Sequence, residues 1–173
     1  MQKNKIYILI LRHLLYVLLL FVFDILQCTP GFFQLWEGKA ILTLGIVVAI
    51  SMFEGPLVGG LYGAFAGLLY DVNSTTVFGF SGVLALTVGV AVGLMACYLV
   101  RNTWLNGLGL MAISVLFVRI IEFIFLYLVW GYQGVWWQLL RNVLPTVCLS
   151  TLLFPVSYWL IKKIYLHLQM KVA

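Results

Sequence analysis

The stretch GPLVGGLYGAFAGLLYDVNSTTVFG, from Gly55 to Gly79, decides the fold of this chain. Inside its apolar part a glycine recurs at every fourth position, at Gly55, Gly59, Gly63 and Gly67. In an α-helix a step of four residues advances about 40° past a full turn, so these glycines share one face. A face without side chains lets a second helix approach closely, which is how helices associate inside lipid. We therefore expect a membrane helix with a smooth packing face.

A second stripe of small residues follows in the next apolar segment, again at every fourth position, at Ser81, Ala85, Gly89 and Gly93. A short polar turn separates the two stripes, so we predict that their helices pack against each other. Asp71 closes the first stripe, and two interpretations of it stay open. It is either a helix-end residue at the membrane interface, or a residue that locks the fold or binds a partner.

The composition is that of an integral membrane protein. Of the 173 residues, 64% are hydrophobic and 9% are charged, whereas about a quarter of the residues of an ordinary soluble domain are charged. A soluble domain of this length has too little interior to bury so many apolar side chains. We expect one membrane domain over residues 1–173, in direct contact with the lipid bilayer.

Basic residues gather at both ends of the chain, with Lys3, Lys5 and Arg12 near the start and Lys162, Lys163 and Lys171 near the end. By the positive-inside rule both termini then lie in the cytoplasm, which requires an even number of membrane crossings. Because these residues flank apolar segments and form no separate basic patch, we expect no binding to nucleic acid.

The apolar segments predict an all-α fold with six transmembrane helices, at residues 6–25, 40–53, 57–71, 79–100, 108–129 and 143–161. The second and third segments are short for a hydrocarbon core about 30 Å thick. Two interpretations compete here: two short helices joined by a turn at Glu54 to Pro56, or one long helix kinked at Pro56. The even number of crossings favours two helices.

Two charged residues, Arg119 and Glu122, fall inside the fifth apolar segment. Their i, i+3 spacing places both on one helix face, where they can pair and so reduce the cost of a charge in lipid. One interpretation is a structural ion pair. The other is a contact or polar pathway for a partner.

The sequence contains no pattern typical of a catalytic or metal site. Cys28, Cys97 and Cys148 are far apart and belong to no Cys-x-x-Cys or Cys/His spacing. The glycines lack the Lys-Ser/Thr pair of a P-loop, and no His-Glu-x-x-His occurs. We therefore predict no enzymatic activity, no metal ion and no cofactor. A proton-coupled carrier that uses Glu54 or Glu122 is a further hypothesis, because ionisable groups inside a membrane are candidates for function.

The run G-x-x-x-G-x-x-x-G-L-L-x-D extends from Gly59 to Asp71 and is followed by Gly79. In this run, and on through the second stripe to Arg101 and Asn102, the chain resembles the family of the rod shape-determining protein MreD. Length, hydropathy and basic ends fit that family over the whole chain. Carried over position by position, the matching residues are Gly59, Gly63, Gly67, Asp71, Gly79 and Arg101.

The resemblance implies a non-catalytic scaffold of the cell-elongation complex in the bacterial inner membrane, which supports cell shape and peptidoglycan synthesis. Its implied partners are the single-pass protein MreC, the glycosyltransferase RodA with its penicillin-binding transpeptidase, and the actin-like MreB. The implied fold is similar to the S-components of energy-coupling-factor vitamin transporters. Glu54 and the pair Arg119 and Glu122 match no position of the family pattern.

The alternative function is that of such an S-component, which binds a vitamin or a similar small molecule. Trp36 and the aromatic cluster from Trp130 to Trp137 could cover a pocket of this kind. Against this alternative, the first apolar segment is bulky from Ile8 to Leu19, where S-components present a small, alanine-rich face to their transport partner.

Overall fold

The computed structural model describes residues 2–29, 34–35, 38–73, 78–100, 102–125 and 135–169. Within them the chain is all-helical apart from one short antiparallel pair of strands, β1 (Gln34–Leu35) and β2 (Gly38–Lys39). The helices are α1 (Gln2–Cys28), α2 (Leu42–Glu54), α3 (Pro56–Asn73), α4 (Phe80–Tyr98), α5 (Trp104–Phe123) and α6 (Val135–Gln169). The predicted all-α class is confirmed.

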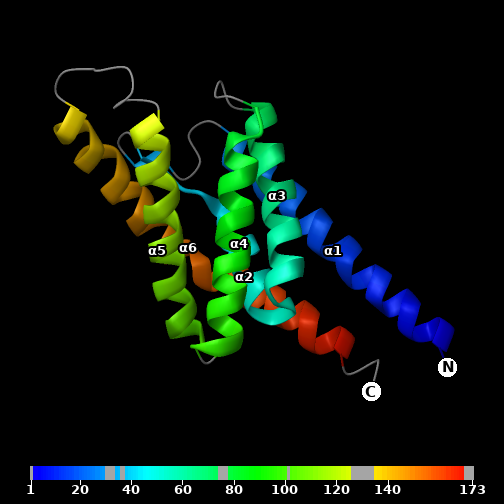
Figure 1. Cartoon of the computed structure of the whole chain (residues 1–173). Helices are drawn as coiled ribbons and strands as arrows, with labels where there is room; N and C mark the ends of the chain where they lie inside the picture. The colour runs from blue at the N-terminus through cyan, green and yellow to red at the C-terminus, as the bar shows by residue number, and fades with distance from the viewer. Residues whose placement is uncertain are drawn as a thin grey trace.

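Four of these helices are long and apolar enough to cross a membrane, over Lys5–Cys28, Phe80–Tyr98, Trp104–Phe123 and Val143–Gln169. The chain is therefore a multi-pass membrane protein. The helices run alternately in opposite directions, so that the start of α1 and the end of α6 lie at the same end of the bundle (Figure 1). We call this the terminal end, and the other the opposite end.

The fifth and sixth helices differ from the predicted segments at their boundaries. α5 begins at Trp104 and its regular part ends at Phe123, whereas the expected segment continued to 129, of which 126–129 lie outside the described residues. α6 begins at Val135, before the expected start at 143, and therefore contains both Pro145 and Pro155.

α2 forms the centre of the bundle and contacts every other helix. Its residues from Leu42 to Met52 are all buried. With 13 residues it is too short for a regular span, and it is apolar on all sides, which suits a helix surrounded by protein. α1 is the opposite case, because only 11% of its apolar window is buried inside the protein.

The chain reverses between α2 and α3, so these are two packed helices and not one kinked helix. Gly55 follows α2 with a φ of 92°, a left-handed backbone conformation that residues other than glycine rarely adopt. Pro56 then begins α3, a position where the missing N–H group of proline costs nothing. We call this reversal the elbow. It lies at the terminal end, below α3 in Figure 1.

Candidate functional site

α3 and α4 contact each other through their backbones over the length of the two glycine stripes. A methyl group added at Gly63 would overlap the carbonyl of Ala85, and one added at Gly67 would overlap the carbonyl of Ser81. A side chain at either position would therefore push the helices apart. Figure 1 shows the two helices side by side at the front of the bundle.

The same contact continues toward the terminal end. A methyl group at Gly89 would overlap the carbonyl of Gly59, and one at Gly93 would overlap Pro56. Gly59 also faces α2, where an added methyl group would overlap Ser51. The glycine interface, as we call this contact between α3 and α4, thus also seats α3 on the central helix.

Gly55 has a different position from the other glycines of its stripe. The sequence spacing counted it with the packing glycines, and the structure places it before α3, at the elbow, within the turn predicted at Glu54 to Pro56. The reason is local: a positive φ at Gly55 ends α2, so the next helix cannot include it. Its contribution is the turn itself, although its backbone still lies against Gly93.

Asp71 lies at the opposite end of the bundle and is 3% exposed. Its Oδ2 accepts a hydrogen bond from the backbone N–H of Gly79 at 2.8 Å. Gly79 directly precedes α4 and has a φ of 93°, so the carboxylate at the end of α3 holds the start of α4. A negative group at a helix N-terminus is favourable because the first N–H groups lack partners within the helix.

Asp24 is a second buried carboxylate at this end, 5% exposed. Asn73 donates a hydrogen bond from Nδ2 to its Oδ2 at 3.3 Å. This bond joins the end of α1 to the end of α3. Local sequence carries no signal of this bond, because the two residues lie 49 positions apart.

At the terminal end five polar and aromatic side chains form an elbow cluster around Glu54, made of Arg12, His13, Tyr16, Glu54 and Tyr62. Arg12 Nε lies 3.0 Å from Glu54 Oε1, and both side chains are largely buried. The hydroxyl of Tyr16 donates to the same oxygen at 3.0 Å. The guanidinium also lies 5.5 Å from the ring centre of Tyr165 in α6. Glu54 thus connects α1 to the elbow.

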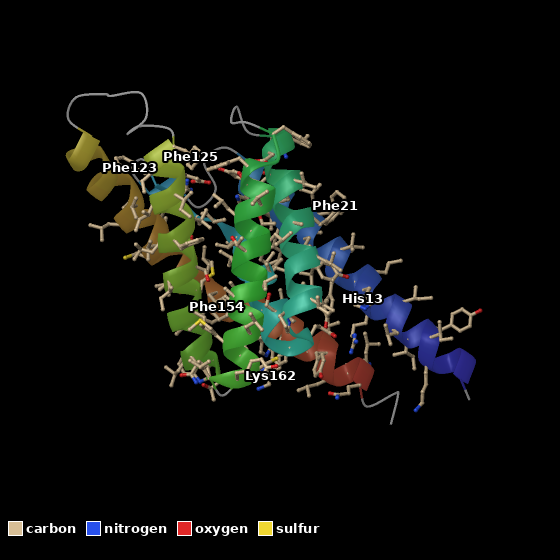
Figure 2. The ribbon with its side chains drawn as sticks, in the orientation of Figure 1. His13, Phe21, Phe123, Phe125, Phe154 and Lys162 are labelled. Carbon is tan, nitrogen blue, oxygen red and sulfur yellow. The ribbon has the colours of Figure 1, made fainter. Side chains whose placement is uncertain are left out.

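His13 and Tyr62 make the second half of the elbow cluster. His13 Nδ1 lies 3.0 Å from the hydroxyl of Tyr62, which also donates to the backbone carbonyl of His13 at 3.2 Å. Their rings stack at 6.0 Å, and Tyr16 packs edge-on against both. Figure 2 shows His13 and Lys162 toward the terminal end and Phe123 and Phe125 at the opposite end. The sequence placed Arg12 near the basic start of the chain and Glu54 at the turn between the second and third segments, and it carried no sign that the two pair.

Arg119 and Glu122 pair as the spacing predicted, with Arg119 Nη1 donating to Glu122 Oε2 at 2.8 Å. Glu122 also lines a cavity of about 40 Å³ between α2, α3, α4 and α5. Its other polar lining residues are Gln27, Thr43, Tyr70 and Ser81. A cavity of this size holds a few water molecules at most. The structure brings neither residue of the pair into contact with the elbow cluster.

Gln27 fixes one wall of this cavity. Its Oε1 accepts hydrogen bonds from the backbone N–H of Thr43 at 3.1 Å and from the Thr43 hydroxyl at 2.6 Å. These bonds join the end of α1 to the start of α2. As with Asp24, local sequence carries no signal of a partner this far along the chain.

Several sequence-predicted positions lie outside the part of the chain that the structure describes. They are Arg101, Trp36 and the side chains of the Trp130 to Trp137 cluster. Among the described residues, no three His, Cys, Asp or Glu side chains gather closely enough to hold a metal ion.

Comparison of the chain with known protein families, with curated proteins and with solved structures finds no match in any of the three. The function is therefore argued from the geometry above and from the motif resemblance.

Proposed function

We propose that this protein is a non-catalytic membrane scaffold of the MreD type, which binds the transmembrane segment or stem of MreC in the bacterial inner membrane. In this proposal RodA, its penicillin-binding transpeptidase and MreB join through the same complex, and no cofactor takes part. The chain crosses the membrane six times with both termini in the cytoplasm.

One observation carries the proposal. The residues of the resemblance that the structure describes fall on one structural unit: Gly59, Gly63 and Gly67 lie in the glycine interface, and Asp71 holds Gly79. A motif whose members all serve one contact is under a single physical constraint. That constraint is the relative placement of α3 and α4.

The glycine faces of α3 and α4 are buried against each other, so the proposed partner contact uses other surfaces. The side of α3 that faces away from α4 is apolar and exposed, with Leu57 and Val72 among its exposed side chains. Next to the outer turn, this surface is suited to a single membrane helix. Asp71 then acts by fixing the turn, and its carboxylate need not touch the partner.

The test is an affinity purification of the tagged protein from native bacterial membranes, with mass spectrometry of the recovered proteins. We expect MreC and the RodA complex. Gly63→Leu should abolish their recovery because it separates α3 from α4. Gly109→Leu is the matched control, since a methyl group added at Gly109 meets nothing within 4 Å.

Normal recovery of MreC with Gly63→Leu in folded protein would remove the glycine interface from the mechanism. Recovery of transporter ATPase subunits in place of MreC would overturn the scaffold proposal as a whole.

The second candidate is a vitamin-binding S-component, and the cavity beside Glu122 is the observation that favours it. Its volume of about 40 Å³ is far below the range of about 300–1,000 Å³ typical of small-molecule sites. Binding would therefore require α2 to α5 to move apart. Mass spectrometry of small molecules released from the purified protein tests this candidate, and a vitamin recovered in equal molar amount would establish it.

A further inference from the structure

A groove of about 430 Å³ lies between α1 and α3 on the membrane-facing side of the protein. Its walls are Val17, Val58, Leu61 and Phe65, and its polar part is His13 and Tyr62. Two contacts between α1 and α3 border it. One is the hydrogen-bonded pair of His13 and Tyr62, and the other is the edge-on ring contact of Phe21 and Phe65 at 5.9 Å.

The polarity of the groove lining differs along its length. His13 and Tyr62 form the polar part, with Val58 beside them on the terminal side. Val17 and Phe65 lie toward the bundle centre, so the part of the lining nearest the centre is wholly apolar. An occupant with a polar part next to one apolar chain matches this order. A hydrocarbon without a head group would make no polar contact with His13 or Tyr62.

The face of α1 that lines the groove continues toward its start. His13 and Val17 are four residues apart, and the same spacing leads back through Leu9 to Lys5. Residues four apart share a helix face, and Lys5 and Leu9 are exposed. The positively charged Lys5 therefore lies on the groove-lining face of α1, on the terminal side of His13.

The terminal end is also positively charged as a whole. Lys162 and Lys163 of α6 lie there on aromatic rings and are exposed. The acidic side chain at this end, among the described residues, is Glu54, which is paired with Arg12. Negative charge in an occupant is therefore favoured.

We propose that this groove binds one anionic phospholipid. One acyl chain lies along Val17, Leu61 and Phe65, the glycerol region lies at His13 and Tyr62, and the phosphate group lies at Lys5. The volume of about 430 Å³ suits a small-molecule occupant. The inference shares the exposed side of α3 with the proposed partner contact, but it uses no residue of the glycine interface.

The experiment is native mass spectrometry of the purified protein in detergent, with palmitoyl-oleoyl phosphatidylglycerol or the zwitterionic phosphatidylcholine of the same chains. We expect the anionic lipid to be retained in preference. Lys5→Gln should reduce that preference by about fivefold, the effect of one basic residue near an anionic lipid surface. Lys163→Gln is the matched control, with the same charge change at the same end and a smaller effect. Equal retention of the two lipids, or equal effects of the two variants, would overturn the proposal.

A second variant tests the acyl-chain part of the site. Leu61→Trp fills the groove from a position that is 72% exposed. Leu57→Trp makes the same change one turn earlier on α3, where the side chain is 82% exposed and does not line this groove. We expect Leu61→Trp to lose the bound lipid and Leu57→Trp to keep it. Retention of lipid by both variants would exclude the groove as the site.

The unmodified protein gives an independent readout. A phosphatidylglycerol with a photoreactive group in its acyl chain should label Val17, Leu61 or Phe65 more than Val83, an exposed residue on α4. Even labelling of all four would identify ordinary bilayer contact and overturn the proposal. In native membranes, absence of labelling at Val17, Leu61 and Phe65 would mean that a partner protein occupies the groove. That result would also overturn the proposal.

Discussion

α4 lies on α3 backbone to backbone, whereas α1 is joined to the rest of the bundle by the side chains of individual residues. At the glycine interface no side chain fits between the helices at Gly63, Gly67 or Gly89. At α1 the contacts include the ion pair of Arg12 with Glu54 and the hydrogen bonds of His13 and Tyr16. Asp24 and Gln27 add hydrogen bonds near the other end of the helix. The first contact is continuous, and the second consists of a few separate points.

The two contacts represent two ways in which helices associate inside lipid, where water is absent. Apolar burial gives little driving force between helices in lipid, so association depends on close packing or on polar contacts. The glycine interface uses close packing, which tolerates no added volume. α1 uses polar contacts, each of which can be lost singly. Substitutions at both kinds of contact test this contrast.

Gly63→Leu should cause the largest loss, about 3 kcal/mol of unfolding free energy, because the side chain has no space and overpacking forces backbone shifts. Denaturant titration of the protein in detergent measures it. Gly109→Leu, in open space, should cost much less. Equal losses in the two variants would show that the interface is not closely packed.

Asp71→Ala should cost about 2 kcal/mol, since it removes a charged acceptor and leaves the Gly79 N–H without it. The same titration applies, with Val72→Ala, at a 70% exposed neighbour, as the control. Should Asp71→Ala keep full stability but lose its partner proteins, the residue would be a contact site and not a lock.

Arg12 and Glu54 should show a coupling of about 1.5 kcal/mol in a double-mutant cycle of Arg12→Gln and Glu54→Gln, near the upper limit for polar pairs within membranes. The single variants should loosen α1 while leaving the glycine interface intact. Proteolysis near the start of α1 reports the loosening. A coupling near zero would mean that packing, and not the ion pair, holds α1.

Tyr62→Phe should have the smallest effect, about 0.6 kcal/mol, the average for one polar contact between membrane helices. It removes the hydroxyl that bonds His13 and keeps the stacked ring. Tyr98→Phe, at an 81% exposed side chain, is the control. A loss as large as that of Gly63→Leu would contradict the view that α1 is held by separate, additive contacts.

Much of the architecture followed from local patterns. Apolar segments indicated where the six helices of the described residues lie, and the fourfold spacing of small residues indicated which faces of α3 and α4 are smooth. The i, i+3 pair of Arg119 and Glu122 was predicted because both partners are on one helix. Contacts of this kind depend on residues near each other in sequence.

The partners of Glu54, Asp24 and Gln27 could not be predicted, because each bond joins helices whose relative rotation is a property of the whole bundle. Gly55 was placed in the stripe for a related reason. Its spacing fits the helix, and only its positive φ excludes it. Spacing cannot distinguish a glycine that packs from a glycine that turns.

The sequence by itself determined that this is a membrane protein, where its helices lie and that two of them have smooth faces, since composition and periodicity carry that information. The tertiary structure alone decided that α2 is the buried centre, that Asp71 holds the start of α4, and that α1 stands apart far enough to leave a groove. These features depend on how the helices are rotated and tilted against one another. That arrangement is set by the packing of all six helices together and by no single segment.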